Sequence, residues 1–404
     1  MAATIRFIRR LSTKSSIVNK LINVLQSSPC EARETKLADF FEIYNKQVGA
    51  ATCSNIISDV INHLAIQKPE KPALWTFESK SKAHSALTYN EVYKQSCQLA
   101  NVLTGKQYNL KQGHAVLVIL PHNMKERFLL WLACLQTGLV FCPYDPKELT
   151  EIGISQRIRR LIIDCVITDE DNLEMVRHCT YTPLRPLTKG VIMKGSASEL
   201  PPVSWNHLIQ AANNADSQYT KMVNTNPNMP AMRFLSNKQH VIQYSQEYLS
   251  TRLIITALWL GKYKVPNLVW MKSRTDIMSM APWLFGSSIF CNESENLKTM
   301  FDTLKNYPID AFCAPQANYR MLEDEQQQEE HKNQLQQLFS FEPISADLKA
   351  RWLSLTNLSV HDDYAAFNDE SKLKYFPNND QQKPDHDFEE FEQQQQQQQQ
   401  QQIN

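Results

Sequence analysis

Few side chains in this sequence are spaced as a catalytic or metal-binding set would be. His207, His240 and Cys313 stand far apart, at no spacing that suggests a nucleophile with its base or a pair of metal ligands. There is no G-x-S-x-G elbow, although a Ser/His/Asp triad of distant residues stays open. Asp362-Asp363 with Glu370 carries charge for a cation, but a solvated acidic loop is the commoner outcome. We therefore expect no metal site.

Glycine is scarce, which limits any chemistry that needs a glycine-rich loop. The chain of 404 residues has nine glycines, where average usage would give roughly 28. Only Gly261 and Gly286 lie beyond residue 195, and the early ones are isolated, as at Gly105 and Gly113. The nine cysteines include no C-x-x-C and no tight Cys/His cluster, which favours reduced thiols in the core over a structural zinc site.

Composition sets the class of protein. Hydrophobic residues make up 42% and charged residues 21%, enough for a real core in two or three domains of ordinary size. The formal net charge is zero, so no general attraction to nucleic acid or to an acidic membrane is expected. No window reaches the roughly 18 uninterrupted apolar residues of a spanning helix, so no transmembrane segment is expected.

The two ends differ in composition from the rest of the chain. Residues 1–30 contain Arg6, Arg9, Arg10 and two lysines, with no acid before Glu31. This basic, broken amphipathic composition is typical of a mitochondrial transit peptide, and it predicts location in the mitochondrial matrix. Residues 377–404 combine an acidic, proline-dotted stretch with a polyglutamine run. Because this tail offers little apolar surface to offset ordering entropy, we expect it to be disordered.

Between these ends, apolar runs and helical periodicity alternate at βαβ spacing. The continuous apolar run 115–120 predicts a strand buried on both faces of a parallel sheet. The sequence therefore predicts an α/β fold with two packed doubly wound, mostly parallel sheets and flanking helices, in subdomains of about 31–210 and 231–376. Strands are expected at 73–77, 87–89, 115–120, 138–142, 164–168, 190–193, 231–235, 267–271, 287–291, 309–313, 340–344 and 358–361. Helices are expected within 34–66 and at 91–103, 125–136, 155–162, 172–179, 247–260, 297–306 and from 317.

Several segments, in order and at matching spacing, resemble the medium-chain acyl-CoA synthetases of the adenylate-forming, AMP-binding superfamily. The match runs from about residue 35 to about residue 370. The segments that carry it are LTYNEV at 87–92, WLACLQTGLVFCP at 131–143, RIRRLIIDCVITD at 157–169, PWLFG at 282–286, LKNYPIDAFCAPQANYRML at 304–322 and EPI at 342–344. The resemblance implies the N-terminal body of an enzyme that joins a carboxylic acid to coenzyme A through an acyl-adenylate, with ATP, Mg²⁺ and CoA as its cofactors.

The positions that the resemblance assigns to ATP are altered. The family's phosphate loop, "FTSGTSGxPK", matches 234–240, which contains no glycine and is shorter by about five residues. Ser236 and Lys238 remain as its hydroxyl and lysine. Glu342-Pro343 persists from the family's "GEPL", but Phe341 replaces the glycine before it. Tyr364 persists from the adenine and metal segment "YGxTE", which reads YAAFN at 364–368.

Two further segments of the family are not found. The pocket segment around "DxGW" is shortened at 271–277, and nothing after residue 376 resembles the C-terminal domain with its adenylation lysine. That lysine would offset charge in the transition state, so losing such groups costs several kcal/mol of barrier. From this resemblance the degenerate ATP-site residues are Ser236, Lys238, Glu342, Pro343 and Tyr364. No catalytic residue and no cofactor are expected.

Three interpretations follow. The first is a non-catalytic pseudoenzyme that binds a protein partner, or holds an acyl or nucleotide ligand weakly. The second is an active acyl-CoA synthetase, and the absent glycine loop separates it from the first. The third is a non-functional fragment, which a cooperative unfolding transition would argue against.

Overall fold

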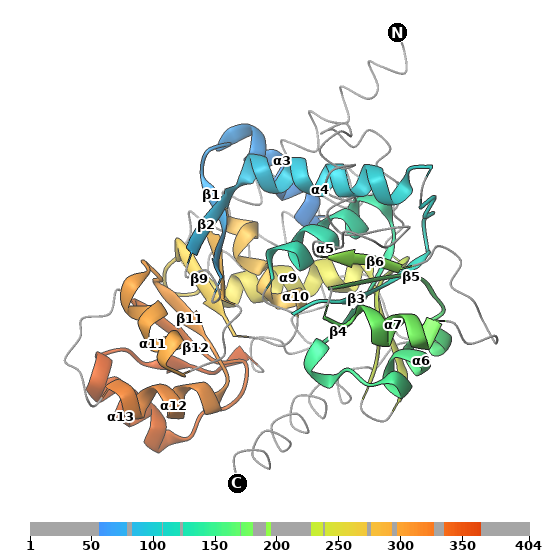
Figure 1. The fold of residues 1–404 in the computed structure, drawn as a ribbon. Coiled ribbons are helices and arrows are strands. Elements are labelled where there is room, and N and C mark those ends of the chain that lie inside the picture. The colour runs from blue at the N-terminus through green and yellow to red at the C-terminus, as the bar shows by residue number, and fades with distance from the viewer. Residues whose placement is uncertain are drawn as a thin grey trace.

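The computed structural model describes the central part of the chain. The described residues are 56–78, 83–106, 108–121, 124–169, 171–180, 191–194, 228–236, 239–272, 276–292, 297–326 and 335–364. The predicted transit peptide at 1–30, the predicted tail at 377–404 and the helices expected before residue 56 lie outside them. Within the described residues, two sheets and their flanking helices confirm the predicted α/β fold (Figure 1).

One sheet has six strands, in the order β6-β5-β3-β4-β7-β8. Its pairs are parallel except for the antiparallel hairpin of β7 with β8. β3 lies at its centre, and all five of its residues are buried, as the apolar run predicts. The strands are β3 (Ala115–Ile119), β4 (Val140–Tyr144), β5 (Ile163–Asp169), β6 (Val191–Lys194), β7 (Pro230–Leu235) and β8 (Val241–Ser245).

The other sheet has seven strands, in the order β13-β12-β11-β9-β10-β1-β2. It is parallel except where β1 pairs with β2. Its strands are β1 (Pro72–Glu78), β2 (Ala83–Thr88), β9 (Leu268–Met271), β10 (Ser288–Asn292), β11 (Ala311–Cys313), β12 (Gln337–Phe339) and β13 (Val360–His361). Each sheet therefore draws strands from both sides of the division expected between residues 210 and 231. An early hairpin, β1–β2, pairs with the late strand β10, and β7–β8 extends the sheet of β3 to β6.

A layer of helices lies between the sheets. The largest apolar cluster joins one face of each sheet to α3 (Ile56–Gln67), α4 (Tyr89–Thr104), α5 (Lys125–Thr137) and α9 (Gln246–Leu260). α6 (Glu151–Arg160) and α7 (Leu173–Thr180) cover the outer face of the six-stranded sheet. α11 (Leu297–Asn306), α12 (Gln316–Gln326) and α13 (Ala346–Thr356) cover the outer face of the seven-stranded sheet. Short α10 (Asp276–Ser279) and the 3₁₀ turns η1 (Pro146–Glu148) and η2 (Ala281–Phe285) complete the described elements.

Local signals explain several element boundaries. The Thr88 hydroxyl accepts from the Glu91 N–H at 3.2 Å, and the Glu91 carboxylate accepts from the Thr88 N–H at 2.7 Å. This capping box starts α4, and it selects Thr88 over Asn90 as the cap. Gly138, at φ 69°, ends α5 in the left-handed conformation that glycine adopts without strain.

Some predicted elements are wrong. No strand covers 340–344: β12 ends at Phe339, and the segment after it is a loop that contacts α12. The helix expected at 155–162 begins four residues earlier, at Glu151. Thr150 is its N-cap, and the Thr150 hydroxyl accepts from the Gly153 N–H. The β8 strand was not expected, because five residues that run directly into a helix give a weak alternation. No helix among the described residues is long and apolar enough to cross a membrane.

Candidate functional site

The segment that the resemblance assigns to phosphate binding is a tight hairpin turn. β7 and β8 stay paired up to Leu235 and Val241. Beyond that pair, the Ser236 N–H donates to the His240 carbonyl at 2.9 Å, so the pairing continues to these two residues. Gln239 closes the turn at φ 63°, and its N–H donates to the Ser236 carbonyl at 2.8 Å. A left-handed residue at the end of a three-residue loop is a common way to close a hairpin.

The Ser236 hydroxyl is engaged inside this turn. It accepts from the His240 N–H at 3.0 Å, and the Ser236 residue is 7% exposed. A hydroxyl that accepts from a backbone N–H of its own hairpin stabilises the turn. Lys238 lies outside the described residues. Ser236 therefore has a structural role, whereas the role assigned to Lys238 stays a prediction.

The other predicted residues gather at the carboxyl ends of β12 and β13, where aromatic rings fill the space. The Phe341 ring lies edge-on to the Tyr364 ring, with centroids 5.0 Å apart at 89°. The Trp259 ring of α9 contacts both, at 5.2 Å from Phe341 and 5.0 Å from Tyr364. The Tyr364 hydroxyl lies 3.1 Å from the Thr256 hydroxyl, also on α9. Tyr364 is thus a buried part of the core, and its ring is covered by protein side chains.

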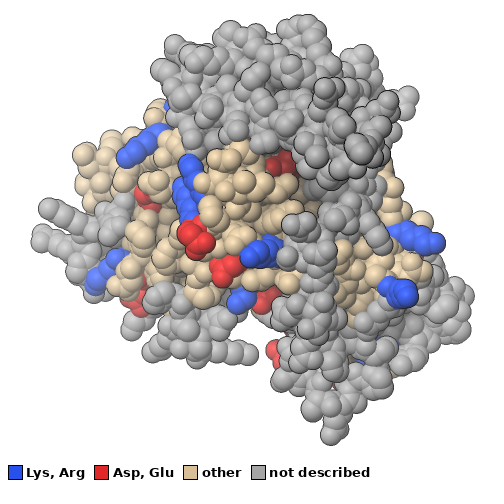
Figure 2. All heavy atoms as spheres, turned by 90° about the horizontal axis from the view of Figure 1, so that it is seen from above, with Lys and Arg blue, Asp and Glu red and all other residues tan. Residues whose placement is uncertain are grey.

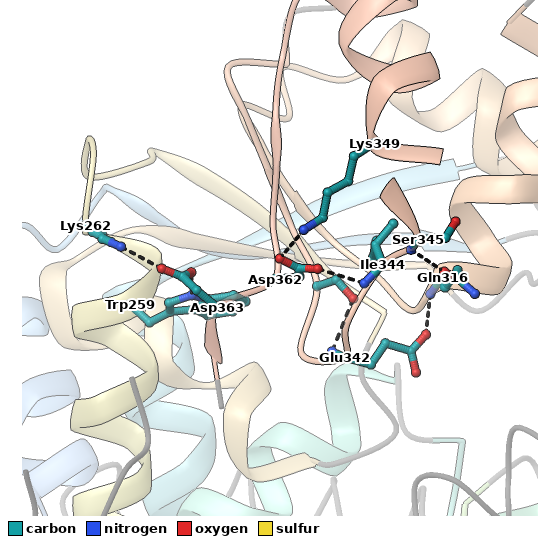
Figure 3. A network of polar contacts seen from close by, with 10 residues as sticks. Trp259, Lys262, Gln316, Glu342, Ile344, Ser345, Lys349, Asp362 and Asp363 are labelled. Atoms are coloured by element: carbon teal, nitrogen blue, oxygen red, sulfur yellow. Dashed lines mark hydrogen bonds and ion pairs between the residues drawn. The ribbon is translucent and has the colours of Figure 1, made fainter. Parts of the chain in front are cut away.

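The Glu342 carboxylate points toward Gln316, on α12 (Figure 3). It accepts a hydrogen bond from the Gln316 N–H, the first residue of that helix. A carboxylate at this place satisfies an unpaired N–H group and favours the helix dipole. Burial raises the pKa of Glu342, and the hydrogen bond from Gln316 opposes the rise in part. Glu342 therefore acts as a cap of α12, and the exposed Pro343 follows it in the loop.

Two adjacent aspartates hold the segment that follows β13, and they point in opposite directions (Figure 3). Asp362 accepts from the Ile344 N–H at 2.7 Å and from Lys349 Nζ, on α13, at 2.6 Å. Asp363 accepts from Trp259 Nε1 at 2.9 Å and from Lys262 Nζ at 2.6 Å. Burial favours a higher pKa at Asp363, but the Lys262 and Trp259 hydrogen bonds outweigh it and lower the pKa.

Asp362 and Asp363 therefore each form an ion pair with a lysine, and they are not arranged around a cation. Glu370, which the sequence places with them, lies outside the described residues. Among the described residues, no group of three His, Cys, Asp or Glu side chains is placed to hold a metal ion. The seven described cysteines are buried free thiols, and burial raises the pKa of Cys142 and Cys165 to about 12.

The structure divides the predicted site residues between two places. Ser236 is at the tip of the β7–β8 hairpin of the six-stranded sheet, whereas Glu342, Pro343 and Tyr364 follow strands of the seven-stranded sheet. Sequence reasoning missed Trp259, whose ring contacts Tyr364 of the second group, and Lys262, which pairs with the neighbouring Asp363. The signal in the sequence was the mostly apolar helix α9, which contains Trp259 and indicates burial but not the partner.

Comparison with known proteins finds relatives of this chain by sequence. The model of the AMP-binding enzymes matches residues 62–234. Acyl-coenzyme A synthetase ACSM4, mitochondrial, of Homo sapiens is 26% identical over 352 residues, which is 81% of this chain and 58% of that protein. Acyl-coenzyme A synthetase ACSM3, mitochondrial, of Pongo abelii is 23% identical over 335 residues, 79% of this chain and 56% of that protein.

The chain is a homologue of the medium-chain acyl-CoA synthetases. Solved structures agree on the fold of this acyl-CoA synthetase homologue. Apo MatB from Rhodopseudomonas palustris has a TM-score of 0.61 at 15% identity, covering 76% of this chain and 58% of that one. The anthranilate CoA ligase AuaEII, in complex with anthranoyl-AMP, has a TM-score of 0.62 at 13% identity, covering 75% of this chain and 58% of that one.

The homologue spans somewhat more than half the length of the synthetases that it matches, 58% of human ACSM4. MatB has been solved with ATP bound, so the shared fold accommodates that nucleotide in MatB. The resemblance implies ATP contacts at Ser236 and Tyr364. In this chain the hydroxyls of both residues form hydrogen bonds within the protein, with His240 and Thr256 respectively.

Proposed function

We propose that this acyl-CoA synthetase homologue does not activate carboxylic acids and acts by binding, to a protein partner or to a weakly held acyl or nucleotide ligand. The observation that carries the proposal is the β7–β8 hairpin. A phosphate cradle needs several backbone N–H groups that face outward and a loop flexible enough to wrap the anion. Here the Ser236 and Gln239 N–H groups are bonded within the turn, and the Ser236 hydroxyl is bonded to His240.

The aromatic cluster supports the same proposal. Phe341 stands where the resemblance places a glycine, directly before Glu342, and its ring contacts Trp259 and Tyr364. A glycine there would leave one side of the Tyr364 ring open, whereas a phenylalanine ring takes that volume. The residues present therefore do not fit the adenine and phosphates of ATP.

Location follows from the relatives and from the N-terminal composition. The similar synthetases ACSM4 and ACSM3 are mitochondrial by name, and residues 1–30 have the composition of a transit peptide. We propose the mitochondrial matrix as the compartment, 31–376 as the AMP-binding-like body and 377–404 as an appended tail. A tagged full-length chain seen only in the cytosol would contradict this location.

Turnover is the direct test. Purified protein is first tested for cooperative unfolding, which would argue against a non-functional fragment. It is then incubated with ATP, Mg²⁺, CoA and octanoate, and pyrophosphate release is followed beside an active acyl-CoA synthetase as positive control. The expected result is no release above a no-enzyme blank. Pyrophosphate release that depends on octanoate would establish an active synthetase instead. Calorimetric titration with octanoate, octanoyl-CoA and AMP then measures which ligand class is bound.

A further inference from the structure

The turn that joins α6 to β5 exposes a strained isoleucine. α6 ends at Arg160, Leu161 caps it, and Ile162 adopts φ 56° before β5 starts at Ile163. A helix that ends with a left-handed residue usually has glycine there, and a β-branched residue in this region is a genuine outlier. The Ile162 side chain is also 53% exposed. Backbone strain and an apolar group in water are two separate costs at one residue, and neither helps the fold.

A hydrogen bond from strand β7 anchors this turn. Leu161 is fully buried, and its carbonyl accepts from Arg233 Nη1, on β7, at 2.7 Å. The remaining guanidinium nitrogens of Arg233 donate to Gln243 Oε1 at 3.1 and 2.9 Å. A hydrogen bond from the sheet therefore anchors the residue before Ile162.

Two exposed arginines precede Ile162 at the end of α6. Arg159 and Arg160 are exposed on the last turn of α6, and neither forms an ion pair with another described residue. Arg157 is turned inward, with its guanidinium carbon 3.6 Å from the centre of the Tyr144 ring. Asp164 is the nearest acid along the chain, and its carboxylate accepts from the Ala115 N–H at 2.9 Å within the sheet. The exposed tip thus carries positive charge and one aliphatic group.

This charge is local. The whole chain has zero formal net charge, and Figure 2 shows basic and acidic side chains interspersed over the described part of one face, with no broad field of one sign. A long-range electrostatic attraction is therefore not expected. Any anion that this tip attracts has to come within a screening length of about 10 Å of it.

We propose that the Arg159–Ile162 tip docks on an anionic lipid surface, with Arg159 and Arg160 at the headgroup phosphates and Ile162 inserted among the upper acyl chains. Basic residues next to an apolar side chain are the composition of interfacial membrane contacts. The exposed Ile162 side chain favours a lipid over a nucleic acid as the partner. Moving an aliphatic group from water into acyl chains is favourable, whereas contact with a phosphate backbone gives it no such gain. The proposal does not depend on whether the protein turns over ATP.

The test is co-sedimentation of the full-length chain with vesicles of phosphatidylcholine alone and of phosphatidylcholine mixed with cardiolipin. Wild type is expected to partition to the mixed vesicles only, and added salt is expected to weaken the partition. Ile162→Asn should lower the partition coefficient about tenfold, and the Arg159→Gln/Arg160→Gln pair should lower it by a similar factor or more. Matched controls are Ile152→Asn, an exposed isoleucine at the other end of α6, and Arg320→Gln, an exposed arginine on α12; both should partition as wild type does.

Folding is checked on the same samples. Asparagine tolerates the left-handed region, so Ile162→Asn is expected to melt no lower than wild type, and a loss of binding is then not a loss of fold. Equal partition of Ile162→Asn and wild type, or no preference of wild type for cardiolipin, would overturn the proposal. Binding to an RNA oligonucleotide that Ile162→Asn leaves unchanged would assign the tip to nucleic acid and overturn it as well.

Discussion

The Phe341 ring packs edge-on against the Tyr364 ring, 5.0 Å away, and this contact joins the loop after β12 to the segment after β13. Both rings rest on Trp259 of the central helix layer. The contact makes a specific prediction about the ATP-site position. If Phe341 takes the space that an adenine ring needs, removing its side chain should open that space without disturbing Tyr364, whose hydroxyl is held near Thr256.

Phe341→Gly is therefore expected to gain a response to AMP. The variant should lose about 2 kcal/mol of unfolding free energy, because a half-buried ring is removed. Its melting temperature should rise with AMP, whereas that of wild type should not. Phe234→Ala, which removes another half-buried ring from its contact with Tyr244, is the control and should destabilise without an AMP response. An AMP response in wild type equal to that of Phe341→Gly would show that Phe341 blocks nothing.

Ser236→Ala tests whether the hairpin hydroxyl has a ligand role. The hydroxyl accepts the His240 N–H, so its loss should lower the unfolding free energy by about 1 kcal/mol. Ser245→Ala, at the other end of β8, removes the cap of α9 and should cost about as much. Isothermal titration with ATP should give the same weak or absent signal for wild type and both variants. An ATP affinity that falls in Ser236→Ala alone would make Ser236 a phosphate ligand.

The strands that sequence predicted best are those buried on both faces. β3 reads as an unbroken apolar run because Val116 and Val118 face the central helices while Leu117 and Ile119 face α6 and α7. The β8 strand was missed because its burial alternates over only five residues before α9 begins. The segment 340–344 looks strand-like in sequence, but the Ile344 N–H is taken by the Asp362 carboxylate rather than by a neighbouring strand.

The candidate site was only partly predictable for a related reason. Resemblance identified Phe341, Glu342 and Tyr364, since each stands in a short motif. It did not show what they contact. Trp259 lies more than 80 positions before Phe341, and Gln316 reaches Glu342 across 26 positions, so both contacts depend on how the sheets and helices pack. No local periodicity carries that information.

Asp363→Asn tests the ion pair that holds the segment after β13. The variant should lose about 0.5–1 kcal/mol at neutral pH, since the Lys262 pair is partly exposed to solvent. The pKa of Asp363 is lowered in the folded state, so its stabilisation is present above the unfolded value near 3.9 and is lost as pH falls through the folded pKa. Denaturant titrations should show the gap between wild type and variant closing below about pH 4. Asp347→Asn, at the exposed pair with Arg351, should change stability little at neutral pH.

Glu342→Gln should show the opposite trend with pH. Burial raises the pKa of Glu342 in the folded state, so the group favours folding below the unfolded value near 4.3 and that contribution is lost as pH rises through the folded pKa. At neutral pH the ionised carboxylate therefore carries a burial cost that a glutamine avoids, while the amide oxygen can still accept the Gln316 N–H. Denaturant titrations should find Glu342→Gln more stable than wild type at pH 7, with the difference vanishing at acid pH. A variant less stable than wild type at pH 7 would mean that the charge-assisted cap of α12 outweighs the burial of Glu342.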